Sequence, residues 1–296
     1  MPGTPTAPDS TTAPVHVIGA SGRSGQALCR ALLGRGTRFV PVVRNAARWA
    51  ETGLPGAARI ADLQGDGLTA ALAGAGAVVS CAHARHIPAI LAAAPASARL
   101  VFLGSTRKFT RWPDAHGDGV LAGESAFHAS GRAGAILHPT MIYGAEGEDN
   151  VQRLAALLRR LPVVPLPGGG RALVQPIHQA DLTHCIVAAL GTDWRGPVSL
   201  VIAGPAPLPY ADFVRAVAAA AGLPPPRIVG VPSWMLLLAA PLTRVPGLPR
   251  IEAAEIRRLL EDKAFDIAPM QASLGVEPMA LADGLALTFK KAPACP

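Results

Sequence analysis

The residues best suited to chemistry begin with a glycine-rich loop near the N-terminus, Gly19-Ala20-Ser21-Gly22-Arg23-Ser24-Gly25. Glycine at positions 19 and 22 lets the backbone turn sharply and approach a pyrophosphate, and Gly25 lets the next helix pack closely on a sheet. The start of that helix offers N–H groups and the positive end of its dipole to phosphate oxygens. The spacing G-x-x-G-x-x-G differs from the dinucleotide fingerprint G-x-G-x-x-G, so an ordinary glycine turn is the alternative interpretation.

To bind a phosphate in this way, the loop must follow a strand and precede a helix. An apolar strand is expected over 15–18 and a helix over 26–33, and a strand over 39–43 completes a β-α-β unit. The alternation then continues, which predicts an α/β fold with a Rossmann-type doubly wound parallel sheet. Further strands are expected at 59–61, 77–80, 100–103, 135–137 and 198–202, with helices at 68–72, 87–94 and 121–129 and a polar loop at 113–119.

The end of the second strand bears on which dinucleotide is bound. An acidic residue there hydrogen-bonds the ribose 2′-hydroxyl of NAD, whereas an arginine favours the 2′-phosphate of NADP. No acidic residue occurs between Asp9 and Glu51, and Arg44 closes the second strand. Arg23 in the glycine loop is another guanidinium that suits a phosphate. The sequence therefore favours NADP(H) over NAD(H), and a solvated strand-end charge is the alternative interpretation of Arg44.

The glycine loop and four later motifs resemble the short-chain dehydrogenase/reductase superfamily, in the extended and atypical branches that include the NAD(P)-dependent epimerase/dehydratase proteins. The later motifs lie at 62–63 (DL), 103–106 (LGST), 136–144 (ILHPTMIYG) and 175–182 (QPIHQADL), within a region of resemblance over 14–205. The resemblance implies that an acidic residue, here Asp62, approaches the adenine, and that Pro139 and Thr140 form a wall against the nicotinamide. The full candidate cofactor set is Gly19, Ser21, Gly22, Arg23, Ser24, Gly25, Arg44, Asp62, Leu63, Cys81, Ala82, Gly104, Pro139 and Thr140.

Active members of this superfamily use a tyrosine, a lysine four residues later, and a serine or threonine at the end of the fifth strand. Residues i and i+4 stack on a helix, so the lysine lowers the tyrosine pKa and lets the tyrosine exchange a proton with the substrate oxygen. Ser105 and Thr106 supply the hydroxyl in this chain. If Glu124 is the glutamate that follows the superfamily lysine by four residues, the tyrosine and lysine positions hold His116 and Val120.

Three residues are candidates to replace the missing pair. His116 titrates near neutral pH, Lys108 lies just past Ser105, and Tyr143 follows the sixth strand. Our candidate catalytic residues are Ser105, Thr106, His116 and Tyr143. The competing interpretations are a polar loop residue for His116, a solvated charge for Lys108 and a packed aromatic for Tyr143.

Composition sets the class of the chain and its partners. The 296 residues are 50% hydrophobic and 16% charged, which indicates a globular protein with a substantial core. A net charge of +7 suits an anionic ligand, while 4% aromatic residues and the lack of a long basic run argue against nucleic acid. We expect a flexible tail at 1–13, an NAD(P)-binding Rossmann domain at 14–205 and a smaller substrate-side domain at 206–296. The part at 206–296 is expected to be mainly helical, with helices at 210–221, 233–240 and 251–262. A further helix is expected before it, at 150–161.

Cysteine spacing and apolar runs bear on the compartment. The four cysteines form no C-x-x-C pair, which is typical of buried thiols in a reducing, cytoplasmic compartment. The apolar run at 234–240 ends at Pro241 and is too short for a transmembrane span. Peripheral membrane contact through this run is an alternative hypothesis, and a core-packing helix is the competing interpretation. His178, Asp181 and His184 spread around a helix, so no metal site is expected.

Two hypotheses of different classes follow. The first is an NADP(H)-binding oxidoreductase or epimerase that acts on a small substrate, either a sugar nucleotide or a quinone-like carbonyl. The second is a non-catalytic NADPH-binding module that senses redox state or supports assembly of a complex. The missing tyrosine and lysine motivate the second hypothesis, and they leave open whether the chain is an enzyme.

Overall fold

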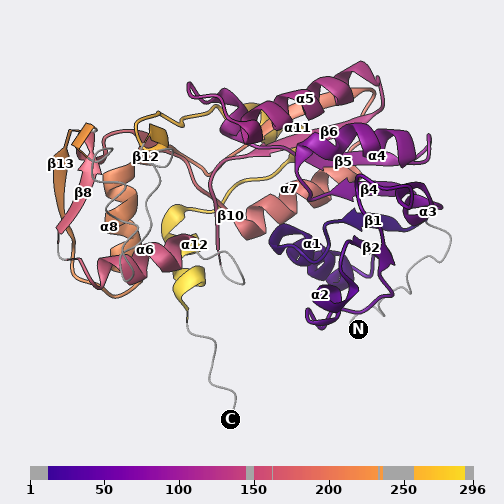
Figure 1. The fold of residues 1–296 in the computed structure, drawn as a ribbon. Coiled ribbons are helices and arrows are strands. Elements are labelled where there is room, and N and C mark those ends of the chain that lie inside the picture. The colour runs from indigo at the N-terminus through magenta and orange to yellow at the C-terminus, as the bar shows by residue number, and fades with distance from the viewer. Residues whose placement is uncertain (1–12, 145–149, 162, 233, 236–256, 291–296) are drawn as a thin grey trace, which may run out of the picture.

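Seven parallel strands form the central sheet, in the order β11-β6-β5-β4-β1-β2-β3 (Figure 1). The computed structural model describes residues 13–144, 150–161, 163–232, 234–235 and 257–290. The order reverses between β1 and β4, which creates the crevice where ligands bind in doubly wound sheets. The predicted fold class is thus confirmed. The strands are β1 (Val15–Ile18), β2 (Phe39–Val43), β3 (Arg59–Ile60), β4 (Ala77–Ser80), β5 (Arg99–Leu103), β6 (Gly134–Pro139) and β11 (Pro197–Ile202).

Helices cover both faces of the sheet because alternate strand residues point to opposite sides. Val79, Val101 and Leu137 enter one hydrophobic cluster with Leu28, whereas Val78, Phe102 and Ile136 enter another with Phe127. The rings of Phe102 and Phe127 lie 5.1 Å apart. The first face carries α1 (Arg23–Gly34), α7 (Gln179–Gly191) and α11 (Ala268–Leu274); the second carries α3 (Leu68–Leu72), α4 (Ile87–Ala93) and α5 (Ala115–Ala129).

A third hydrophobic cluster lies beside the sheet and combines residues from three separate parts of the chain. It draws on α6 (Asn150–Leu158) and β8 (Val163–Pro167), and on α8 (Tyr210–Ala220) and α12 (Leu281–Phe289). Strand β8 pairs in parallel with β13 (Arg227–Val231), at the left of Figure 1. Two further pairs of short strands occur in this part of the chain. Strand β7 (Ile142–Tyr143) pairs with β10 (Ile177–His178), and β9 (Leu173–Val174) pairs with β12 (Leu208–Pro209).

Several expected elements differ from the structure. The polar loop expected at 113–119 is wrong, because the Asp114 side chain accepts the N–H groups of His116 and Gly117 and starts α5 at Ala115. The strand expected at 198–202 is β11, and two further strands that the sequence did not predict, β12 and β13, follow it. Of the helix expected at 233–240 only Trp234 and Met235 are described, and the first half of the helix expected at 251–262 lies outside the described residues, as does nearly all of the N-terminal tail.

Short elements complete the described fold. Helix α2 (Ala46–Ala50) follows β2, and three single turns occur, η1 (Ala84–His86), η2 (Thr106–Phe109) and η3 (Gly168–Gly170). The turns η1 and η2 follow β4 and β5 directly, so both lie at the carboxyl edge of the sheet. Thr106 and Lys108 lie in η2, with Ser105 just before it, and Cys81 and Ala82 lie between β4 and η1.

Candidate functional site

The glycine loop follows β1, and its glycines permit a close approach of the backbone. Gly19 has a φ of +74°, a conformation that residues with side chains rarely adopt. A Cβ on Gly25 would lie 2.2 Å from the carbonyl oxygen of Gly19 and 2.8 Å from the Cα of Ala20. Only glycine fits there, so the first turn of α1 packs directly against the loop. This cradle fits the phosphates of a dinucleotide cofactor.

The start of α1 faces the loop with its backbone N–H groups. The N-cap is Gly22, and in the described part of the chain no side chain caps the helix there. The Gly22 N–H donates to the Gly19 carbonyl at 2.9 Å, which fixes the turn. Ser24 anchors the helix to α7, because its hydroxyl donates to Gln179 Oε1 at 3.2 Å. The remaining donors and the helix dipole suit an anion.

Arg44 and Asp62 follow neighbouring strands at this edge. The N–H of Ala61 donates to the Val43 carbonyl at 3.0 Å, so the ends of β2 and β3 lie side by side. Both Arg44 and Asp62 are exposed. Asp62 Oδ1 accepts the Gln64 N–H at 3.0 Å, which closes a turn that carries Leu63.

The end of β4 lies against the glycine loop. A Cβ on Gly19 would stand 3.4 Å from the backbone of both Cys81 and Ala82. The Cys81 N–H donates to the Ile18 carbonyl at 3.0 Å. Burial raises the pKa of the Cys81 thiol to about 12, so the thiol is uncharged at neutral pH and packs as a small apolar group.

Ser105 is the N-cap of η2, two residues beyond β5. Its Oγ accepts the Arg107 N–H at 3.1 Å, which leaves the hydroxyl hydrogen able to donate to a ligand. Thr106 differs, because its hydroxyl is buried and donates to the Pro139 carbonyl at 3.2 Å. Thr140 likewise donates to the Gln175 carbonyl, at 2.5 Å. Of these hydroxyls, Ser105 is therefore the one best placed for chemistry.

His116 lies in the first turn of α5 and is linked to Ser105 through one residue. Arg107 donates its backbone N–H to Ser105 Oγ, and its side chain pairs with Asp114, the N-cap of α5. The His116 ring makes an edge contact with His83, at 4.3 Å between centroids. Burial, with Arg107 next in size, lowers the pKa of His116, so the ring is neutral at pH 7.

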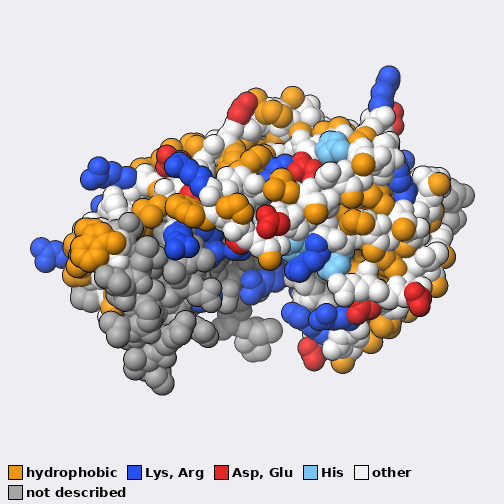
Figure 2. Space-filling view, turned by 45° about the horizontal axis from the view of Figure 1, so that its top comes forward, with side chains coloured by type: hydrophobic (Ala, Val, Ile, Leu, Met, Phe, Trp, Pro, Cys, Tyr) orange, Lys and Arg blue, Asp and Glu red, His pale blue; other side chains and the backbone are white. Residues whose placement is uncertain are grey.

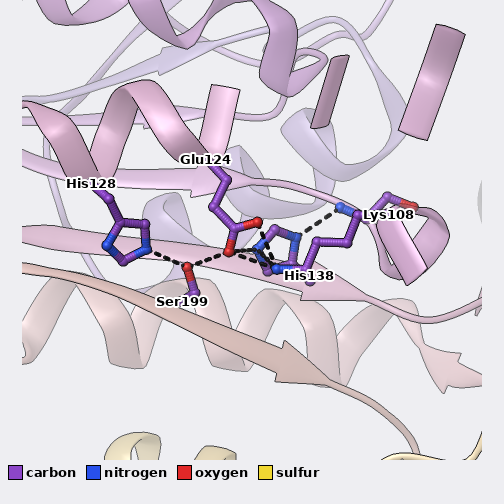
Figure 3. Close-up of polar contacts among 6 residues, drawn as sticks. Lys108, Glu124, His128, His138 and Ser199 are labelled. Carbon is purple, nitrogen blue, oxygen red and sulfur yellow. Dashed lines mark hydrogen bonds and ion pairs between the residues drawn. The ribbon is translucent and has the colours of Figure 1, made fainter. Parts of the chain in front are cut away.

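A buried polar network lies under α5, beside Ser105 (Figure 3). Lys108 Nζ donates to both carboxylate oxygens of Glu124 at 2.6 Å. His138 on β6 is completely buried, with Nε2 3.2 Å from Glu124 Oε1 and Nδ1 accepting the Ser105 N–H at 3.2 Å. Ser199 Oγ donates to Glu124 Oε1 at 2.6 Å and lies 2.7 Å from His128 Nε2 at the surface. The network thus joins side chains from η2, α5, β6 and β11.

The charges in this network are fixed by burial and hydrogen bonds. Burial, with Lys108 next, lowers the pKa of His138 to about 4, so the ring is neutral. Since Nδ1 accepts from Ser105, the neutral ring carries its hydrogen on Nε2 and donates it to Glu124. Burial alone would raise the pKa of Glu124, but hydrogen bonds from Lys108 and Ser199 outweigh burial and lower it. The buried part of the network therefore holds an ionised Glu124 beside the neutral ring of His138 at pH 7.

A cavity of about 310 Å³ opens beside Ser105 at the carboxyl ends of β5 and β6. Phe265 and neighbouring residues form its far wall. Gln175, 2% exposed, holds that wall in place by accepting the Phe265 N–H at 2.8 Å and donating to the Gly204 carbonyl at 2.8 Å. A cavity of about 190 Å³ lies at the opposite edge of the sheet, but the Arg132 guanidinium there is occupied by backbone carbonyl oxygens. The cavity beside Ser105 is the better candidate for substrate.

Comparison with known proteins bears on the fold. Neither a protein-family model nor a curated protein matches the sequence. Among solved structures, an NADPH-dependent quinone oxidoreductase from Escherichia coli in complex with NADPH matches with a TM-score of 0.71 at 18% identity, over 93% of this chain and 100% of the other. A UDP-glucuronic acid 4-epimerase from Bacillus cereus, in complex with UDP-glucuronic acid and NAD, matches with a TM-score of 0.70 at 17% identity, over 93% and 97%. The chain has the fold of the extended short-chain dehydrogenases/reductases.

A third match extends the likeness to another epimerase of this fold. UDP-glucose 4-epimerase from Thermotoga maritima, with UDP-glucose, aligns with a TM-score of 0.71 at 13% identity, over 93% of this chain and 97% of the other. The likeness covers nearly the whole length of each protein, including the third hydrophobic cluster. The extended short-chain dehydrogenase/reductase fold therefore includes the region beyond the sheet.

Two positions of the short-chain dehydrogenase/reductase fold bear on the missing pair. Val120, which the resemblance aligns with the lysine, is 1% exposed and belongs to the second hydrophobic cluster. Tyr143 is also 1% exposed, and a Cβ on Gly284 of α12 would lie 2.2 Å from its hydroxyl. Burial, together with Asp181 and Asp283, raises the pKa of Tyr143. This environment favours packing over proton transfer for Tyr143.

The remaining candidates lie away from the cavity or outside the described residues. His178 caps α7 and Asp181 in its first turn accepts the Met279 N–H at 3.1 Å. The described ranges contain no group of three or more potential metal ligands, and none of their helices is long and apolar enough to cross a membrane. Trp234 and Met235 are exposed, while the rest of the apolar run expected to contact a membrane, 236–240, lies outside the described residues.

The buried network is the part of the site that sequence reasoning missed. In the sequence, Lys108 is a candidate to replace the missing pair, Glu124 marks the position after the superfamily lysine, and His138 belongs to the motif at 136–144, but nothing links the three. One signal was present: His138 interrupts the apolar strand 135–137 at its end, where a polar residue needs a partner when buried. The identity of that partner depends on the packing of α5 over β6.

Proposed function

We propose that the chain binds a nicotinamide dinucleotide along the carboxyl edge of the sheet, with NADP(H) preferred, and acts as an oxidoreductase or epimerase on a small substrate beside Ser105. The observation that carries the proposal is the glycine cradle at the start of α1, on the same sheet edge as Ser105 and its cavity. Arg44 at the end of β2 supports the preference for NADP(H). The solved structures of this fold that hold NAD or NADPH support the cofactor class.

The candidate cofactor residues divide by position. Gly19, Gly22, Ser24 and Gly25 would hold the pyrophosphate, with Ser21 and Arg23 in the same loop. Arg44, Asp62 and Leu63 would meet the adenosine half, and Cys81, Ala82, Gly104, Pro139 and Thr140 the nicotinamide half. A bound nicotinamide supplies or accepts hydride. The residues of the chain would exclude water from the site and donate a proton to, or accept one from, the substrate oxygen.

Ser105 and His116 are the proposed proton-handling residues. The Ser105 oxygen already accepts the Arg107 N–H, so its hydrogen can be donated to a substrate carbonyl or alkoxide oxygen. His116 is neutral at pH 7 because of its lowered pKa, and a neutral imidazole accepts a proton when the substrate hydroxyl is oxidised. Thr106 and Tyr143, whose side chains are buried, have a structural role and take no part in proton transfer.

The catalytic part of the proposal is tested by NADPH oxidation with a panel of carbonyl compounds that includes quinones and sugar-nucleotide ketones. We expect turnover with at least one compound and a loss of about 10²-fold or more in kcat in Ser105→Ala and His116→Phe. Thr192→Ala removes a hydroxyl at the end of α7 that donates to the Ala188 carbonyl and does not line this cavity, so it is the matched control. Turnover unchanged in Ser105→Ala would contradict the assignment of Ser105.

The second candidate function is a non-catalytic NADPH-binding module. The burial of Val120 at the position aligned with the lysine favours it, as does the burial of Tyr143. It predicts tight NADPH binding without hydride transfer to any member of the panel. We propose the cytoplasm for either function, since Cys29, Cys81 and Cys185 are free thiols that suit a reducing compartment.

A further inference from the structure

Cationic side chains surround the cavity beside Ser105. Its lining includes Arg107, Arg111, Arg258 and Lys263, together with the acidic residues Glu261 and Asp262. Figure 2 shows Lys and Arg side chains gathered near the centre of the face that it presents. At about 310 Å³, the cavity is at the small end of the range for ligand pockets.

Both acidic residues of the lining are already engaged by the protein. Glu261, 5% exposed, accepts the Thr110 hydroxyl at 2.8 and 3.0 Å and the Arg111 N–H at 2.5 Å. Asp262 Oδ1 accepts the Leu173 N–H at 2.9 Å. These hydrogen bonds hold residues 261–262 against the sheet region. They also occupy carboxylate oxygens that could otherwise pair with the cationic side chains.

The cationic side chains of the cavity differ in whether a carboxylate pairs with them. Arg107 is paired with Asp114. Within the described residues, the Arg258 and Lys263 side chains have no hydrogen-bond or ion-pair partner. Burial lowers the pKa of Lys263, Glu261 opposes that change, and Arg258 and Arg107, which line the same cavity, add to it. His116 is subject to the same positive field, from Arg107 and Arg258.

We propose that this cavity binds an oxyanion of the substrate, a carboxylate or a phosphate, between Arg258 and Lys263. The inference rests on the proposed function and narrows its substrate class to small organic acids or phosphate esters. Apolar walls from Phe109, Met141 and Phe265 would hold the carbon skeleton and leave the reacting oxygen toward Ser105. A purely apolar quinone would leave Glu261 as the counter-charge of Lys263 and would add no negative charge beside Arg258 in a partly buried site.

Calorimetric titration with a matched pair of probes tests the proposal. Benzoate and benzamide are both planar and close in size, but only benzoate carries the anion. With the intact chain, both without NADPH and with NADPH at saturation, we expect benzoate to bind at least about tenfold more tightly than benzamide. Inorganic phosphate in competition with benzoate distinguishes the two oxyanions, since the preferred one displaces the other.

Variants assign the binding to this cavity. In the double variant Arg258→Gln, Lys263→Gln, we expect benzoate affinity to fall about tenfold or more while NADPH affinity stays unchanged. Arg195→Gln removes an exposed arginine between α7 and β11, at the opposite edge of the sheet, and should leave both affinities unchanged. Thermal unfolding verifies that the double variant folds; if it does not, the two single variants are each expected to lose part of the benzoate affinity.

The outcomes separate this inference from the proposed function. Equal binding of benzoate and benzamide, absence of binding by both anions, or undiminished benzoate binding in the variants would overturn the oxyanion site. Failure of NADPH to bind would instead contradict the proposed function. Benzoate binding measured without NADPH would then still report on the cavity itself.

Discussion

His138 accepts the backbone N–H of Ser105 through Nδ1, at 3.2 Å, from the neighbouring strand of the sheet. The opposite ring nitrogen donates to Glu124, which Lys108 holds at 2.6 Å. The bond fixes the backbone at the start of η2, and with it the hydroxyl proposed to meet the substrate. His138 is a positioning residue in this arrangement, since its ring is completely buried.

Removal of the His138 ring should destabilise the fold substantially. His138→Ala leaves a cavity under α5 and leaves the Ser105 N–H without an acceptor, so we expect a loss of about 2–4 kcal/mol in the free energy of unfolding. Urea denaturation measures the loss. His128→Ala, at the exposed end of the same network, should cost less than about 1 kcal/mol. Equal losses in the two variants would contradict the assignment.

Gly104 and His138 should be energetically coupled. A Cβ on Gly104 would lie 2.2 Å from His138 Nδ1, so Gly104→Ala must displace the ring. We expect a loss of about 2 kcal/mol or more in Gly104→Ala, and a smaller loss when the same change is made in a His138→Ala background, where the space is free. Strict additivity in the double-mutant cycle would show that the two residues do not compete for this space.

The stability that the Glu124 carboxylate contributes should depend on pH. The folded-state pKa of Glu124 lies below the ordinary value of 4.5, so the network contributes stability above that value, which is lost as the pH falls through the lowered pKa. We expect Glu124→Gln to lose about 1–3 kcal/mol at pH 7 and to approach the wild type as the pH falls below about 4. A stability difference that stays constant with pH would argue against an ionised Glu124.

The glycine cradle provides a matched pair within one helix. A Cβ on Gly25 collides with the Gly19 carbonyl, whereas a Cβ on Gly34, at the other end of α1, meets nothing within 4 Å. Gly25→Ala should therefore weaken NADPH binding by about tenfold or more or destabilise the fold, and Gly34→Ala should leave binding unchanged. Calorimetry of both variants gives the comparison. Unchanged affinity and stability in Gly25→Ala would exclude the proposed cradle.

The parts of the fold that the sequence predicted are those encoded locally. Residues 15–25 combine an apolar strand, a glycine turn and a helix start within one short segment, and the sheet strands are apolar runs of similar kind. By contrast, β8 and β13 contain proline or glycine and pair across more than 60 residues, so neither is evident from its own sequence. Lys108 lies 30 residues from His138, and Glu124 lies 14 from it. Only the packing of α5 on the sheet brings the three together.

The central claim is a nicotinamide dinucleotide site with a preference for NADP(H), and calorimetric titration with NADPH and with NADH tests it most directly. We predict that the wild type binds NADPH more tightly than NADH. Arg44→Ala should weaken NADPH binding by about 1.5–3 kcal/mol through loss of a charge-assisted contact, with little effect on NADH. Arg195→Ala should change neither. Failure of both nucleotides to bind would contradict the account, and equal affinities unaffected by Arg44→Ala would contradict the preference.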